Sequence, residues 1–226
     1  MIFSIDHVVF AATKQQASDL ITTLHGYGCP LVDFHLDFPE DHLASDSVAL
    51  HGGILLELVY ETADHAGPAA WFEQVPRVIG IGFSSDDFAA DTPWDGDAGA
   101  WTMPAQQGMP SAAGPHEHRC DFYVFVMNRK NGVLQFPGMA SGPQPRLVQI
   151  TLAGSASATW RERLQRWLKL NPDGDSLAVG DIRITFANGR ATGVRADLTL
   201  AGSRNPGRIP LAEGEIRLIE TPETSG

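Results

Sequence analysis

Hydrophobic and polar positions predict a strand, a helix and three more strands at the start of the chain. The first eleven residues, MIFSIDHVVFA, are rich in apolar and β-branched side chains and predict a strand. Apolar residues then recur at helical spacing from Ala17 to Leu24, and Gly26 predicts the end of this helix. Three short runs, CPLVDFH, SVALHG and ILLELVYE, predict further strands. Residues 1–62 therefore follow a β-α-β-β-β order.

The C-terminal part repeats this order over residues 146–221. The strand-like run RLVQITLAG precedes a helical pattern whose apolar stripe extends from Trp160 to Leu168. Alternating apolar residues then predict two strands, joined as a hairpin through Asn188 and Gly189. The run GEIRLIE predicts the last strand.

The middle of the chain, residues 78–138, is less regular. The run PRVIGIGFSS predicts a strand, and RCDFYVFVMN and GVLQFPG predict a hairpin. The stretch 92–117 is rich in Gly, Pro and Ala and is typical of a loop. We interpret this part as a degenerate unit of the same kind. Because each single-faced sheet needs another layer to bury its apolar face, repeated units favour an α+β architecture.

Composition narrows the classes of function. The chain has 226 residues, 43% of them hydrophobic, and a formal net charge of −11 at pH 7. Such a charge repels phosphate backbones and anionic lipid heads, which argues against nucleic-acid and membrane partners. There is no run of about 18 apolar residues and no secretion signal, so we expect a cytoplasmic protein. The two cysteines, Cys29 and Cys120, are too few for a disulfide framework, and we expect small buried side chains.

His7 interrupts the apolar N-terminal strand, where an ionisable group is costly to bury without a partner. Strand alternation predicts that Phe3, Ile5 and Val9 share its face. Glu57 stands in a comparable position, two residues before Val59 in another apolar run. Imidazole and carboxylate are suitable ligands for zinc, iron, nickel or manganese, and a buried carboxylate needs a positive or metal partner unless it is protonated.

The segment IDHVVFAATKQQASDLITTLHGYG, followed by HGGILLELV, resembles the opening module of the vicinal oxygen chelate superfamily, in particular its glyoxalase-like branch. The resemblance covers Ile5 to Val59, about a quarter of the chain, and is architectural over the remainder. It implies an α+β fold in which repeated βαβββ modules form curved mixed sheets around a cleft, with the helices packed outside. The modules would be 1–62, a degenerate 78–138, and 146–221.

The resemblance also implies a divalent metal, bound by His7 on the first strand and Glu57 on the fourth. The second ligand pair departs from the family pattern. Alignment puts Gly80 or Ile81 at the second histidine position and Gln135 at the second glutamate position.

If the C-terminal unit were the partner instead, it would offer Gln149 and, against Glu57, Arg217, and an arginine cannot bind a metal. His116 and His118 share a face if a strand begins there, so they stay open as further ligands.

Three other residues are candidates for ligand binding. Arg204 and Arg208 offer positive charge to a carboxylate or phosphate of a small ligand, the alternative being two solvated arginines. Trp101 is a candidate for the mouth of the cleft, the alternative being a lid on the core.

Two hypotheses of different classes follow. In the first, the protein is a glyoxalase-like lyase, isomerase or dioxygenase: a metal held by His7 and Glu57 polarises vicinal oxygens of a small substrate, and Glu57 shuttles a proton. In the second, the cleft binds or sequesters a small ligand without chemistry, and the pair is a relic. Unless His116, His118 or Gln135 points toward His7, a complete metal site needs a homodimer that supplies ligands in trans.

Overall fold

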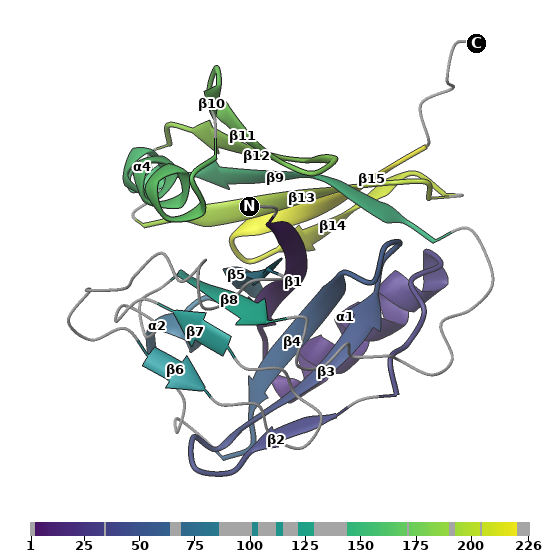
Figure 1. Ribbon diagram of the computed structural model, residues 1–226. Helices are drawn as coiled ribbons and strands as arrows, with labels where there is room; N and C mark the ends of the chain where they lie inside the picture. Colours follow the sequence, from purple (N-terminus) through teal and green to yellow (C-terminus); the bar gives the residue numbers. More distant parts are fainter. Residues whose placement is uncertain are drawn as a thin grey trace.

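The computed structural model describes residues 3–33, 35–63, 69–85, 101–103, 112–114, 122–128, 144–170, 172–189, 193–203 and 205–220. Within these ranges the chain forms two curved mixed sheets, one lying over the other (Figure 1). Its helices are α1 (Lys14–Gly26), the short α2 (Ala69–Phe72) and α4 (Ser157–Leu168). The expected α+β fold class is confirmed.

The first sheet has eight strands in the order β2-β3-β4-β1-β5-β8-β7-β6. Their bounds are β1 (Ser4–Ala11), β2 (Leu36–Phe38), β3 (Leu43–Ala49), β4 (Leu55–Glu61), β5 (Arg77–Ser85), β6 (Trp101–Met103), β7 (Ala112–Gly114) and β8 (Tyr123–Asn128). β1 pairs parallel with β4, β5 pairs parallel with β8, and β1 and β5 meet antiparallel at the centre. The strand order is therefore symmetric about the β1–β5 seam.

The second sheet repeats this plan with seven strands in the order β10-β11-β12-β9-β13-β15-β14. Their bounds are β9 (Arg146–Ala153), β10 (Pro172–Asp173), β11 (Ser176–Val179), β12 (Ile182–Ala187), β13 (Arg195–Ala201), β14 (Gly207–Leu211) and β15 (Gly214–Ile219). β9 takes the place that β1 has in the first sheet, parallel to β12 and antiparallel to β13.

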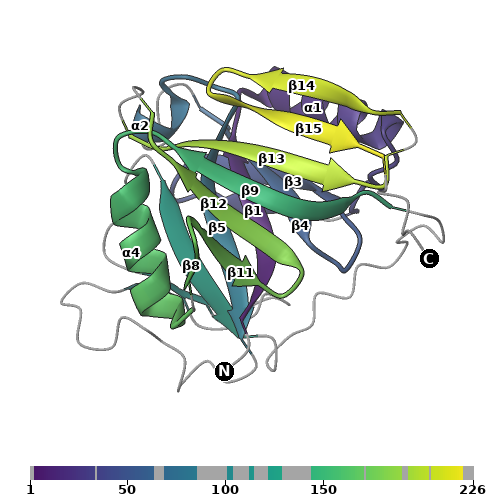
Figure 2. The same ribbon diagram turned by 90° about the horizontal axis from the view of Figure 1, so that it is seen from above.

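The hairpin expected through Asn188 and Gly189 is wrong. Figure 2 shows β12 and β13 on opposite sides of β9, so the two strands that are consecutive in the sequence are not neighbours in the sheet. The alternating pattern determines which face of each strand is buried, but not which strand it pairs with. Local turn chemistry is outweighed here by the pairing of both strands with β9.

One large core joins the two sheets. It contains side chains from the faces that the two sheets turn toward each other and from helices α1 and α4. Phe122 at the start of β8 packs edge-on against Trp160 of α4, with ring centroids 5.2 Å apart. Cys29 is buried in this core, as expected, and burial raises the pKa of its thiol to about 12. Cys120 lies outside the described residues.

Helix α1 starts at a capping box. Thr13 Oγ1 accepts a hydrogen bond from the Gln16 backbone N–H at 3.2 Å, and Gln16 Oε1 accepts one from the Thr13 N–H at 2.9 Å. Gln16 Nε2 also donates to the carbonyl oxygen of Val75 at 3.0 Å, which ties the helix start to the segment before β5. None of the helices in the described ranges is long and apolar enough to cross a membrane.

Because Thr13 satisfies an otherwise unpaired backbone N–H of α1, we expect Thr13→Ala to lower the free energy of unfolding by about 1 kcal/mol. Thr22→Ala, in the exposed middle of the same helix, is the matched control and should change it by less than about 0.5 kcal/mol. Urea denaturation followed by circular dichroism measures both. Equal losses in the two variants would contradict the assigned cap.

Candidate functional site

The face of the first sheet that points away from the large core carries His7, and we call it the His7 face. It consists of His7, Glu57 and a smaller apolar cluster of Val9, Ala11, Leu43, Val59, Ile79, Ala112, Phe125 and Met127. Val9 and Val59 lie on it as expected, whereas Phe3 and Ile5 belong to the large core. The pairing of β1 with β5 shifts register between Ile5 and His7, so strand alternation breaks there.

Strand register arranges this face in two rows across the β1–β5 seam. The first row runs from Leu55 through His7 and Gly82 to Phe125. The second runs from Glu57 through Val9 and Gly80 to Tyr123. Each row thus pairs a β5 glycine with a β8 aromatic residue.

The β8 rings lie directly over the β5 glycines. A β-carbon built at Gly80 would lie 2.8 Å from the Tyr123 ring, and one at Gly82 would lie 2.5 Å from Cζ of Phe125. Any other residue at these positions would force the rings to move, so the two glycines allow the rings to lie flat on the sheet.

Three stacked rings follow one another across the face, and we call Trp71, Tyr123 and Phe125 the ring series. Trp71 and Tyr123 have centroids 5.1 Å apart and planes 13° apart, and Tyr123 and Phe125 are 5.6 Å and 17° apart. The imidazole of His7 continues the series at 6.1 Å from Phe125, tilted by 42°. The series occupies the side of the seam where the resemblance implies a second ligand pair.

His7 is buried, with 6% of its surface exposed, and its Nδ1 atom lies 2.7 Å from Oδ1 of the adjacent Asp6. The Asp6 carboxylate is therefore a charged group placed directly against the buried imidazole.

Glu57 is half-buried and accepts a hydrogen bond on Oε1 from the Ser45 hydroxyl at 2.7 Å. Its negative charge reaches the opposite side of the seam: burial, and then the charge of Glu57, raise the pKa of Tyr123 well above its ordinary value of about 10. The Tyr123 hydroxyl is therefore neutral at physiological pH and can act as a hydrogen-bond donor.

The fourth strand of the second half is not the one expected. β8, with sequence YVFVMN, takes this place beside β5, and Tyr123 lies opposite Gly80. The sequence contains two apolar runs that fit this position, RCDFYVFVMN and GVLQFPG, and periodicity alone did not distinguish them. Gln135, His116 and His118 fall outside the described ranges, and their role as ligands stays a prediction.

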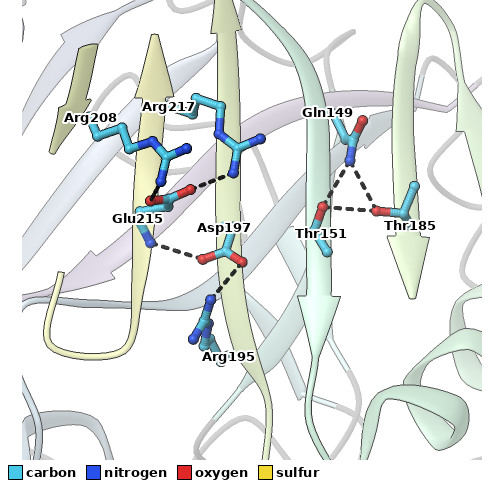
Figure 3. A network of polar contacts seen from close by, with 8 residues as sticks. All are labelled: Gln149, Thr151, Thr185, Arg195, Asp197, Arg208, Glu215 and Arg217. Atoms are coloured by element: carbon cyan, nitrogen blue, oxygen red, sulfur yellow. Dashed lines mark hydrogen bonds and ion pairs between the residues drawn. The ribbon is translucent and has the colours of Figure 1, made fainter. Parts of the chain in front are cut away.

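The alternative partner, the C-terminal unit, is excluded as the second half of the first sheet. Gln149 and Arg217 lie in the second sheet, where Arg217 donates to Glu215 at 2.6 Å and Gln149 donates to Thr151 at 2.9 Å (Figure 3). This polar network also contains Thr185, Arg195, Asp197 and Arg208. The hydrogen bond from Arg217 is the largest cause that lowers the pKa of Glu215.

The candidate ligand-binding residues do not gather near His7. Arg208 lies on β14 of the second sheet, with 68% of its side chain exposed and Nη1 3.6 Å from Oε2 of Glu215. Trp101 begins β6 at the far edge of the first sheet, and only its backbone is described. Arg204 lies outside the described residues.

The described residues do not complete a metal centre. Among them, no three His, Cys, Asp or Glu side chains come together in a way that could hold a metal ion. The His7 face offers His7 and Glu57, while the positions across the seam hold glycines covered by rings. A family-type centre would need ligands from the remainder of the chain or from a second copy.

The ring series was not predicted from the sequence. Its signal was available: glycines at alternate positions in IGIGF and aromatic residues at alternate positions in YVF are the two sides of one contact. The signal becomes visible only when β5 and β8 are known to be neighbours.

Comparisons with known proteins agree with the fold. No family model matches the chain, and no curated protein matches its sequence. A hypothetical protein from Staphylococcus aureus is 8% identical with a TM-score of 0.62, over 97% of this chain and 100% of that one. A variant of 4-hydroxymandelate synthase from Streptomyces coelicolor is 13% identical with a TM-score of 0.57, over 88% and 71% of the two chains.

A third similar structure is a fusion protein of a xylose isomerase-like TIM barrel and 4-hydroxyphenylpyruvate dioxygenase. It is 12% identical, with a TM-score of 0.60, and the match covers 88% of this chain and 36% of that one. At such identities the likeness concerns the fold alone. This chain therefore shares its fold with these three structures.

Proposed function

We propose that this protein is a glyoxalase-like protein that binds a small organic molecule on the His7 face, against the ring series and beside Glu57. The observation that carries the proposal is the seating of Tyr123 and Phe125 over Gly80 and Gly82, opposite His7 and Glu57. Glycine inside a strand lowers the stability of the fold. Two glycines that make room for two rings therefore support a role for these rings in binding.

The chemistry of the face supports a ligand that is mostly apolar with a polar group. Stacked rings offer apolar area with little loss of conformational entropy, and small-molecule sites combine such area with a few polar groups. Here the polar groups are the imidazole of His7, the carboxylate of Glu57 and the neutral hydroxyl of Tyr123. Binding therefore requires no metal.

A metal-dependent enzyme is the second candidate, and the contact between Asp6 and His7 favours it. A carboxylate at Nδ1 commonly orients the other ring nitrogen toward a metal. His7 and Glu57 would hold the ion, which would supply Lewis acidity for the vicinal oxygens of a substrate. The remaining ligands would have to come from His116, His118 or Gln135, or from a partner subunit.

Elemental analysis of protein purified without a metal-affinity tag decides between the two candidates. We expect no stoichiometric transition metal, either in the unmodified protein or in the His7→Ala, Glu57→Ala double variant. A matched control removes the exposed residues His51 and Glu40 in the same way. About one equivalent of metal, lost in the first double variant and retained in the control, would establish the metal-dependent candidate instead.

We expect Gly82→Ala to lower the free energy of unfolding by about 1–3 kcal/mol, because the added methyl group overlaps the Phe125 ring. Combining it with Phe125→Leu should cost less than the sum of the two single changes, since the smaller side chain relieves the overlap. Gly26→Ala is the control, because nothing lies within 4 Å of its added carbon. Urea denaturation measures all four variants, and strict additivity would contradict the contact.

Glu57→Gln should lower the pKa of Tyr123 toward the ordinary tyrosine value, since the charge that disfavours the phenolate is removed. Ultraviolet absorbance titration, taken as the difference from a Tyr123→Phe variant, measures the shift. Because folding raises this pKa, the stability contributed by Tyr123 is intact below about pH 10 and is lost as the pH rises through the folded value. An unchanged titration in Glu57→Gln would show that the two groups lie too far apart to share a ligand.

A further inference from the structure

The negative charge of the protein is concentrated in the part of the chain that builds the first sheet. Residues 1–128 contain three Lys and Arg side chains against eighteen Asp and Glu, whereas residues 129–226 contain thirteen against nine. The part of the chain that builds the first sheet therefore carries a formal net charge of −15, which attracts cations and repels anionic ligands.

Glu57 faces this environment without a basic partner among the residues that the structure describes. The hydrogen bond at its carboxylate comes from Ser45, a neutral hydroxyl. The two basic side chains described in the first sheet and its helices are engaged elsewhere: Lys14 Nζ lies 6.0 Å from the centre of the Tyr60 ring, and Arg77 pairs with Glu213 at 3.2 Å. A half-buried carboxylate on an apolar face is stabilised when a positive group binds beside it.

The ring series adds a second attraction for the same kind of ligand. Aromatic faces carry negative electrostatic potential and attract ammonium groups, most strongly when water is excluded. Tyr123 links the two features, because it stacks between Trp71 and Phe125 and lies in the same row across the strands as Glu57. The same face of the sheet therefore carries both the rings and the carboxylate.

Resting on the ligand-binding function proposed above, we propose that the ligand is an organic cation, whose alkylammonium or quaternary ammonium group lies against the ring series with Glu57 as its counter-charge. A bare metal ion would gain little from the rings, and an anionic ligand would meet a repulsive field. An organic cation uses the apolar area, the ring faces and the carboxylate together.

The test compares two probes of the same shape by isothermal titration calorimetry: choline, which is cationic, and 3,3-dimethylbutan-1-ol, its uncharged analogue. We expect choline to bind roughly tenfold more tightly, and the preference to weaken as ionic strength rises. This comparison uses the unmodified protein, so it does not depend on the folding of any variant.

Two variants locate the site. Glu57→Gln should remove most of the preference for choline, while Glu40→Gln, which removes an exposed charge at the turn between β2 and β3, should change choline affinity by less than about twofold. Tyr123→Leu should weaken choline binding several-fold through the loss of a ring face. Circular dichroism of each variant checks that it folds.

Three results would overturn the inference. If the uncharged analogue binds as tightly as choline, a small molecule binds the face but its charge is not recognised, and the proposed function survives alone. If the preference persists in folded Glu57→Gln, this carboxylate is not the counter-charge. If neither probe binds, nor a neutral aromatic such as benzyl alcohol, the proposed function fails with the inference.

Discussion

The close approach of β8 to β5 through ring and glycine is the contact on which the arrangement of the first sheet depends. Tyr123 and Phe125 lie flat over Gly80 and Gly82 because those residues have no β-carbon. The rings then reach across β5 toward β1, where Val9 and His7 stand in the same two rows. This contact therefore determines which side chains of β8 lie beside those of β1 on the His7 face.

The same topology supports a different surface in the second sheet. Gln149 of β9 stands where β1 has His7, yet it donates hydrogen bonds to Thr151 and Thr185, and charged residues of β13 and β15 lie nearby (Figure 3). The apolar sides of both sheets share the large core, so stability is provided there. The faces that point away from this core contribute less to stability, so their side chains can differ between the two sheets.

The positions of His7 and Glu57 could be predicted from the sequence, because polar residues inside apolar strands are conspicuous at period two. Their partners could not. Asp6 shifts the register of β1, which moves Ile5 to the other face, and no pattern in the sequence indicates such a bulge. Ser45 precedes the run SVALHG that predicts a strand, and nothing relates it to Glu57 until β3 and β4 pair.

The sequence by itself determined the fold class, most strands, both long helices and the presence of two ionisable groups in apolar strands, since these depend on local periodicity. Only the tertiary structure decided which strands are neighbours. It placed β9 between β12 and β13 instead of a hairpin, and it brought the rings of β8 over the glycines of β5. Strand pairing joins residues that are distant in the sequence, and local side-chain patterns do not encode the choice of partner.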